Sequence, residues 1–159
     1  MDEEIKSKKK LTPQQALDKA QRSCAYQERC QQEMRDKLYE WGLYRDVVEN
    51  IIANLITDNF LNEERFAKAY AGGKFRIKKW GKIKIKIELK KRHISDYCIK
   101  RAMEEINDKD YTQTLKQIIT KKSREIKGGE ILVRNYKIAQ YAISRGFEGD
   151  LVWDVLREK

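Results

Sequence analysis

Three stretches of the chain align with one another without gaps, at offsets of 51 and 53 residues. They read LYEWGLYRDVVENIIANL from Leu38, LKKRHISDYCIKRAMEEI from Leu89 and AISRGFEGDLVWDVLREK from Ala142. Each stretch combines the end of one helix-like segment, a short turn at Gly42, His93 or Gly146, and a second segment with apolar residues at helical spacing. Such a period is typical of repeated helical units that bury their apolar faces against one another.

Each aligned stretch is preceded by one more predicted helix. Thr12, Pro13 and Gln15 predict a helix start with a capping box, and Asn62 and Asp110 predict caps in the second and third units. The sequence therefore predicts an all-α fold of three tandem three-helix repeats. The predicted boundaries are 11–60, 61–108 and 109–159, after a disordered charged arm at residues 1–10.

The composition agrees with helices, because the chain has one proline and eight glycines while 38% of its residues are charged. Two of the glycines, Gly72 and Gly73, are adjacent and fall inside the predicted first helix of the second unit. Two glycines inside a helix cost about 2 kcal/mol relative to alanine. We therefore expect a break or kink at this point.

The segment KIKIKIEL alternates apolar and charged residues, which is the pattern of a half-buried strand. The internal repeat favours a helix instead, since Ile85 and Leu89 align with an apolar pair four residues apart in each of the other two units. On a helical wheel, Trp80, Ile83 and Ile87 form a second apolar stripe on nearly the opposite side. We expect this helix to be buried on two sides, with the second stripe against a neighbouring unit.

The formal net charge of +10 is concentrated in one segment. Between residues 74 and 92, ten basic side chains face the single acid Glu88, a local balance of +9: Lys74, Arg76, Lys78, Lys79, Lys82, Lys84, Lys86, Lys90, Lys91 and Arg92. A concentrated basic patch favours a polyanion partner, because each neutralised phosphate releases condensed counterions. The simpler alternative is a solvated helix face.

Other residue types give little support for catalysis. The chain has no Gly-rich phosphate loop, no nucleophile elbow and no HExxH motif. His93 aligns with Gly42 and Gly146, so we interpret it as a turn residue in the left-handed backbone region, in preference to a catalytic base. The sequence therefore predicts no catalytic residues, no cofactor and no enzyme.

The three cysteines, Cys24, Cys30 and Cys98, have no metal-ligand spacing, and only one histidine could join them. We predict no metal site, and cysteines that act as small buried apolar groups in a reducing compartment. No apolar run has the length of about 20 residues that a membrane span needs, so we predict a cytoplasmic protein without membrane contact.

Among the tryptophans, Trp41 and Trp153 are predicted to pack in cores. Trp80 is surrounded by lysines, and stacking on a nucleic-acid base is as reasonable for it as packing.

The motif RFAKAY from Arg65 to Tyr70, followed by KKWGKIKIKIELKKRHI and preceded by CAYQERCQQEMRDKLYEWG, resembles the RecX family of bacterial regulatory proteins. The likeness is strongest over residues 20–106. It implies an elongated, curved chain of three-helix repeats that binds filaments of the RecA recombinase. It also implies a modulating role, mainly inhibition of strand exchange and ATP hydrolysis, in recombination, DNA repair and the SOS response.

The family positions carried over are interpreted mostly as fold determinants: Arg65, Phe66, Ala67, Tyr70, Trp80, Gly81, Lys84, Ile85, Glu88, Leu89 and Ile94. The chain departs from the family pattern at His93, where glycine is usual, and at Lys84, where arginine is frequent. Because lysine lacks the planar fork of arginine, we expect no bidentate contact at residue 84.

Three functions remain open at this stage. The first is a non-catalytic, monomeric regulator of RecA filaments with the basic patch toward the filament or its DNA. The second is a helical protein that binds single-stranded or duplex DNA directly, since helix, tight turn and helix is also the outline of a DNA-reading motif. The third is a repeat scaffold without a nucleic-acid role.

Overall fold

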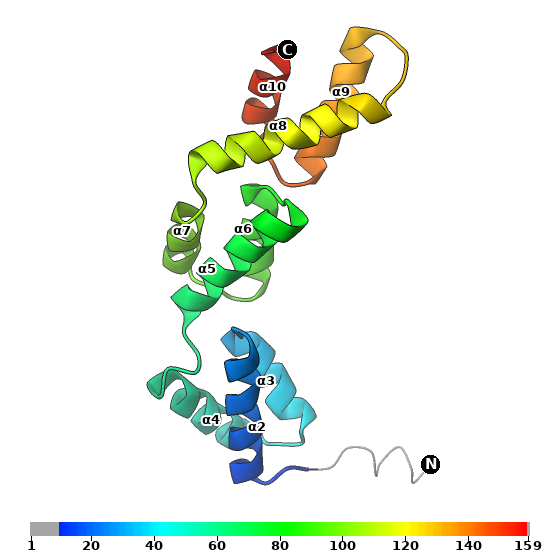
Figure 1. The fold of residues 1–159 in the computed structure, drawn as a ribbon. Helices are drawn as coiled ribbons and strands as arrows, with labels where there is room; N and C mark the ends of the chain where they lie inside the picture. Colours follow the sequence, from blue (N-terminus) through cyan, green and yellow to red (C-terminus); the bar gives the residue numbers. More distant parts are fainter. Residues whose placement is uncertain (1–9, 159) are drawn as a thin grey trace, which may run out of the picture. The chain divides into compact units, whose positions relative to one another are not determined.

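The computed structural model describes residues 10–158 (Figure 1). Every element assigned within that range is a helix, which confirms the predicted all-α fold. The chain divides into two compact units. One unit comprises the chain up to Phe66 together with Arg92–Ile94, and the other comprises Ala67–Lys91 and the chain from Ser95 onward. The predicted arm at residues 1–10 lies outside the described residues except for Lys10.

The first unit is built from three helices: α2 (Pro13–Tyr26), α3 (Gln31–Glu40) and α4 (Arg45–Thr57). The predicted capping box starts α2, because Thr12 Oγ1 accepts from the Gln15 N–H at 3.2 Å and Gln15 Oε1 accepts from the Thr12 N–H at 3.0 Å. The helices enclose a single apolar core, in which Met34, Leu38 and Leu55 are fully buried.

The remaining helices are α5 (Glu63–Gly73), the π-helix η1 (Lys74–Lys78), α6 (Lys82–Lys91), α7 (Asp96–Glu104), α8 (Asp108–Glu125), α9 (Ile131–Ser144) and α10 (Gly149–Arg157). The second three-helix repeat contains α5, α6 and α7, and the third contains α8, α9 and α10. In the third repeat α9 packs against both α8 and α10, as Figure 1 shows.

The glycine pair in α5 does not break the helix. Regular α-helical geometry ends at Gly73, and the chain continues directly into η1. Lys79 closes η1 in the left-handed region, with φ 56°, and the N–H groups of Lys79 and Trp80 both donate to the Lys74 carbonyl. The irregularity expected at Gly72 and Gly73 is therefore a change of helix type next to the pair.

The alternating segment is helix α6, as the internal repeat predicts. Ile85 and Leu89 are fully buried in the position of the repeated apolar pair. Burial on two sides is wrong, because Ile83 is 43% exposed and Ile87 is 50% exposed, while Trp80 is half-buried. The physical reason is that the third repeat meets this segment at the first turn of α6, through the backbone, and leaves the stripe uncovered.

The interhelical turns have the predicted backbone. His93 has φ 60°, and the aligned Gly42 and Gly146 have φ 87° and 102°. Each of these residues ends a helix in the left-handed conformation that glycine adopts without strain and histidine adopts at some cost. The interpretation of His93 as a turn residue is confirmed.

One predicted cap is correct and another is wrong. Asn62 caps α5, since its Oδ1 accepts from the Arg65 N–H at 2.8 Å. Asp110 does not cap α8, because the helix starts earlier and Asn107 accepts from the N–H groups of Lys109 and Asp110, at 2.8 and 3.2 Å. An asparagine and an aspartate three residues apart are equally good caps by type, and the sequence alone does not rank them.

The second and third repeats meet at two glycines. The Gly81 N–H donates to the Arg145 carbonyl at 2.8 Å, and the Ile83 N–H donates to the Gly146 carbonyl at 3.0 Å. A Cβ on Gly81 would lie 2.2 Å from the carbonyl atoms of Gly146, so only glycine permits this approach. The Tyr111 ring also packs in this junction: its centroid lies 5.8 Å from that of Phe75 in the second repeat and 5.0 Å from that of Phe147 in the third.

Candidate functional site

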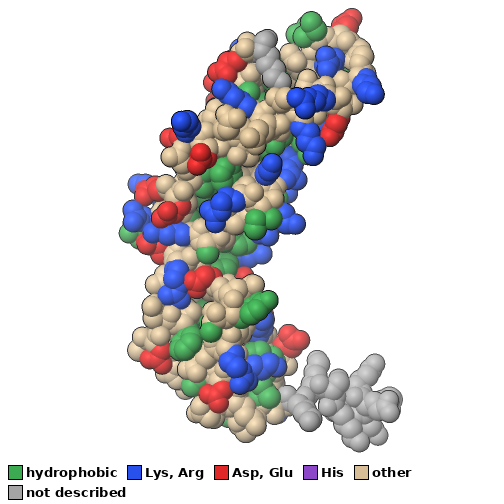
Figure 2. Space-filling model, viewed as in Figure 1, with side chains coloured by type: hydrophobic (Ala, Val, Ile, Leu, Met, Phe, Trp, Pro, Cys, Tyr) green, Lys and Arg blue, Asp and Glu red, His purple; other side chains and the backbone are tan. Residues whose placement is uncertain are grey.

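The basic segment at residues 74–92 does not present its ten cations as one continuous set. Its side chains divide among η1, the surroundings of Trp80, the junction with the third repeat and the C-terminal half of α6. In Figure 2 blue side chains gather along the edge of the molecule where η1 and α6 lie. Each group has a different chemical environment, which decides what it can bind.

Two lysines of the segment lie near the Trp80 ring. The Lys84 ammonium is 4.5 Å from the ring centroid and the Lys74 ammonium is 5.0 Å from it. Lys74 also lies 5.4 Å from the Tyr70 ring centroid. These are cation–π distances, so the half-buried indole is held among cations and does not stand free from the surface.

Lys82 belongs to the junction between repeats. Its N–H donates to the Tyr111 hydroxyl at 2.9 Å, its ammonium lies 4.7 Å from the Tyr111 ring centroid, and it pairs with Asp108 at 3.6 Å. Only 18% of its side chain is exposed. The structure thus places Lys82 as a packing residue, apart from the exposed lysines of α6.

The C-terminal half of α6 carries exposed cations. Lys90 pairs with Asp96 at 3.6 Å and Lys91 pairs with Glu88 at 3.2 Å. Lys86 is exposed as well, and Arg92 lies 3.6 Å from Glu33. Ion pairs at the surface contribute at most about 1 kcal/mol, so these lysines remain able to exchange partners.

Three isoleucines lie uncovered among these cations. Ile83 and Ile87 lie on α6, and Ile77, on η1, is 78% exposed. An exposed apolar stripe flanked by charge is typical of a surface that binds another macromolecule. We call Ile83, Ile87, Lys86 and Lys90 the α6 face.

The remaining cations of the segment lie on η1 and just after it. The Arg76 guanidinium folds back over Gly72, where an added Cβ would lie 2.7 Å from Arg76 Nη1. Lys78 and Lys79 are exposed, and the Lys78 carbonyl accepts a hydrogen bond from Arg145 of the third repeat. The η1 cations therefore face a different element from the α6 face.

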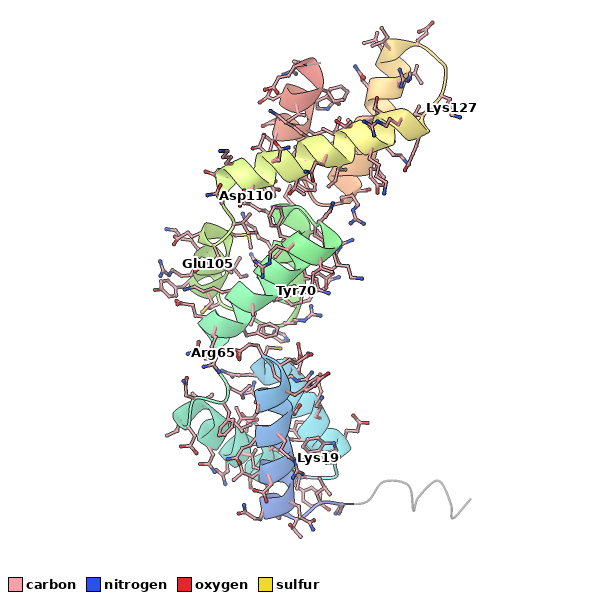
Figure 3. The ribbon with its side chains drawn as sticks, viewed as in Figure 1. Lys19, Arg65, Tyr70, Glu105, Asp110 and Lys127 are labelled. Atoms are coloured by element: carbon pink, nitrogen blue, oxygen red, sulfur yellow. The ribbon has the colours of Figure 1, made fainter. Side chains whose placement is uncertain are left out.

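Several residues of the family motifs stabilise the fold, either by packing in the core or by hydrogen bonds within the protein. Phe66, Ile85, Leu89 and Ile94 are buried apolar residues. Arg65, labelled with Tyr70 in Figure 3, donates to the carbonyls of Asn59 and Phe60 and pairs with the carboxylate of Glu28.

Sequence reasoning missed the residues that the third repeat contributes. The Tyr111 hydroxyl accepts a hydrogen bond from the Lys82 N–H and donates one to the Glu148 carboxylate. Burial raises the pKa of Tyr111 far above its usual value, and the hydrogen bond to Glu148 raises it further. Arg145 supplies both a carbonyl for Gly81 and a guanidinium for Lys78. The sequence carries one signal for this junction, namely glycines at positions 81 and 146, but it does not indicate that these two glycines lie in contact.

The cysteines are free and buried, as predicted. Burial raises the pKa of the Cys30 thiol to about 11, and burial also raises the pKa of Cys24. Both thiols are therefore protonated at neutral pH, which is the unreactive form. Within residues 10–158 no His, Cys, Asp and Glu side chains group closely enough to hold a metal ion. None of the helices in that range has both the length and the apolar character required to cross a membrane.

Three family models match the chain in order. They are described as the first, second and third three-helix domains of RecX, and they match residues 16–55, 62–103 and 108–156. The matched ranges follow the three helix groups of the structure. The repeat boundaries predicted from the sequence at 60/61 and 108/109 stay predictions.

Curated relatives carry the name Regulatory protein RecX. The protein from Clostridium acetobutylicum is 30% identical, and the alignment covers 80% of this chain and 61% of that relative. The protein from Prosthecochloris aestuarii is 27% identical over 90% of this chain and 92% of its own length. The chain spans about 60% of the clostridial relatives and 50% of the protein from Bacillus cytotoxicus.

Two solved structures share the fold. A crystal structure of RecX from Lactobacillus salivarius superposes with a TM-score of 0.82, covers 92% of this chain and 95% of its own, and is 23% identical. A crystal structure of regulatory protein RecX has a TM-score of 0.80 at 19% identity, and 74% of that chain is covered. At these identities the likeness concerns the fold.

Proposed function

The chain belongs to the RecX family of regulatory proteins, and on that premise we propose that it binds RecA nucleoprotein filaments and restrains their strand exchange and ATP hydrolysis. In this proposal the protein is a cytoplasmic monomer that acts by binding, without catalysis of its own. It works in recombination and DNA repair, including the SOS response. Its partner is the filament, and any contact with the filament's DNA is secondary.

The observation that supports this proposal is the α6 face. It combines two half-exposed isoleucines with exposed lysines on one helix, in the segment that carries most of the net charge. Uncovered apolar side chains gain free energy from a protein partner, and the lysines steer the approach to an acidic surface. A nucleoprotein filament offers both a protein surface that can cover the isoleucines and negative charge that can attract the lysines.

The α6 face gives less support to direct reading of duplex DNA. Side chains that distinguish bases in the major groove are chiefly arginine, asparagine and glutamine, with lysine as an alternative for guanine. The sequence of α6 contains lysine, isoleucine, leucine and one glutamate, and none of the planar amide or guanidinium groups. We therefore keep naked-DNA binding as the alternative that the experiments must separate.

The test reverses two charges of the α6 face. Lys86→Glu with Lys90→Glu leaves the buried Ile85 and Leu89 in place, and it spares Lys82 because that residue belongs to the repeat junction. The readout is the RecA ATPase on single-stranded DNA, titrated with the variant. Two exposed charge pairs, at up to about 1 kcal/mol each, predict a half-inhibiting concentration about tenfold higher, and a smaller change at high salt.

Arg22→Glu with Arg45→Glu is the matched control, because it makes the same charge change at two exposed residues of the first unit. It should inhibit like the original protein. If the α6 variant folds, as judged by circular dichroism, and inhibits as well as the control, the α6 face is not the filament-binding surface.

A further inference from the structure

A cleft of about 380 Å³ lies within the second unit, between η1 and the helices α8 and α9. Half of its lining residues are basic, and the only acid among them is Glu125. The basic lining residues are Lys78, Lys79, Lys121, Lys122 and Arg145. Three of these come from the third repeat, so this site extends well beyond the basic segment found in the sequence.

Two of the five cations have partners inside the protein. The Arg145 guanidinium donates to the Lys78 carbonyl, which ties the two walls of the cleft together. The Lys122 ammonium lies 3.4 Å from a Glu125 oxygen and 4.5 Å from the centroid of the Tyr141 ring. These contacts hold the Arg145 and Lys122 side chains against the walls of the cleft.

The other three cations form no ion pair, and the one acid of the cleft, Glu125, is paired with Lys122. Lys78, Lys79 and Lys121 are exposed, and no carboxylate of residues 10–158 lies within ion-pair distance of their ammonium groups. Three like charges around one cleft repel one another, and an anion in the cleft relieves that repulsion. The arrangement therefore attracts a ligand with several negative charges.

Lys79 also has an unfavourable backbone. Its φ of 56° lies in the left-handed region, which glycine adopts without steric cost and a residue with a Cβ adopts only with strain. At Lys79 the strained residue is one of the three uncompensated cations of the cleft.

The lining also has an apolar part, which narrows the class of ligand. Ile77 is 78% exposed, Tyr141 is 38% exposed, and Ile118 is half-buried beside them. A ligand that alternates charge with flat or apolar groups can use both parts of the cleft. Single-stranded nucleic acid has this composition, since its phosphates bind lysines and its bases or sugars pack on aromatic and apolar side chains.

We propose that this cleft binds the phosphodiester backbone of a single-stranded nucleic acid through Lys78, Lys79 and Lys121. An acidic peptide is a poorer match, because its carboxylates come without the flat bases that can pack on the exposed Ile77 and Tyr141 side chains. The proposal concerns the protein alone and does not depend on the recombinase. Its failure would leave the filament proposal standing, and the reverse also holds.

The experiment measures fluorescence anisotropy of a labelled thymidine oligonucleotide with the full chain, over a range of salt concentrations. The test variant combines Lys79→Gly with Lys121→Gln. Each lysine that contacts a phosphate of a single strand contributes about 0.7 to the slope of log affinity against log salt. We expect the variant to lose about 1.4 of that slope and at least tenfold in affinity at low salt.

Folding is checked by thermal unfolding, both for the double variant and for Lys79→Gly alone. Glycine suits the left-handed backbone of residue 79, so thermal unfolding of Lys79→Gly alone should occur at the same or a higher temperature than in the original protein. The control variant, Arg22→Glu with Arg45→Glu, should keep the salt slope and affinity of the original protein.

Competition separates the sources of negative charge. Unlabelled oligonucleotide should displace the probe far better than ATP, inorganic tripolyphosphate or polyglutamate at equal charge concentration. Equal displacement by ATP or tripolyphosphate would make the cleft a site for free phosphate compounds, and equal displacement by polyglutamate would make it a site for acidic protein. Either result overturns the proposal, as does a test variant with the original affinity and salt slope.

Discussion

Gly81→Ala probes the contact that joins the second and third repeats. The added methyl group would lie 2.2 Å from the carbonyl atoms of Gly146 and 2.3 Å from the Phe147 nitrogen, and all of these are backbone atoms that cannot rotate away. The two repeats must therefore separate slightly at this point.

The expected size of the effect follows from the contacts that separate. Two backbone hydrogen bonds, from Gly81 to Arg145 and from Ile83 to Gly146, contribute about 1 kcal/mol each. Loosening of the aromatic contact between Phe75 of the second repeat and Tyr111 of the third adds roughly 0.5–1.5 kcal/mol. Alanine returns about 0.5–1 kcal/mol by restricting the unfolded chain, so the net loss is about 2 kcal/mol.

The assay is thermal unfolding followed by circular dichroism. A loss of about 2 kcal/mol lowers the Tm by roughly 4–8 °C in a chain of this size. Gly73→Ala is the control, because Gly73 has helical dihedrals and no atom lies within 4 Å of an added Cβ. That variant should gain about 0.5–1 kcal/mol. If the Tm of Gly81→Ala equals or exceeds that of the Gly73→Ala control, the close approach of the two repeats is refuted.

Three further predictions concern stability. Tyr111→Phe removes a hydroxyl that accepts the Lys82 N–H at 2.9 Å, and urea titration should show a loss of about 1–3 kcal/mol. Leu89→Ala empties a fully buried site and should cost about 2–5 kcal/mol in the same titration, whereas Ile87→Ala, at a half-exposed site, should cost less than about 1 kcal/mol. The folded Cys30 pKa of about 11 exceeds its ordinary value of 9.0, so stability from the protonated thiol is complete below pH 9 and is lost as pH rises to about 11. Unfolding measured against pH should show this fall, and Cys30→Ala should reduce it.

The helices and most of the core could be predicted from the sequence because they depend on residues close in the chain. The repeat alignment identified Ile85 and Leu89 as core residues although their own segment alternates like a strand. The same alignment gave His93 its left-handed turn. In both cases three copies of a pattern supplied what one copy leaves ambiguous.

The contacts between repeats could not be predicted in the same way. Helical spacing places Ile83 and Ile87 on one stripe, but it does not say whether a neighbour covers that stripe, and none does within residues 10–158. Lys82 belongs to the same charged run as Lys86, yet the Tyr111 hydroxyl and Asp108 hold it at the junction. These differences depend on residues far apart in the chain.

The candidate site was predicted in part. The basic segment identified the lysines of the α6 face, whose role as a filament contact stays a prediction. The cleft was missed because Lys121 and Lys122 lie in α8 and Arg145 follows α9, and their sequence positions do not show that they meet η1. Only the fold brings them beside Lys78 and Lys79.

The central claim is that the protein recognises a RecA filament in preference to DNA. The most direct measurement is fluorescence anisotropy of the labelled protein with single-stranded DNA, either bare or coated with RecA and a non-hydrolysable nucleotide. The proposal predicts clearly tighter binding to the coated strand, with weaker and salt-sensitive binding to the bare strand. Equal affinity for both would contradict it in favour of direct DNA binding, and no binding to either would favour a scaffold.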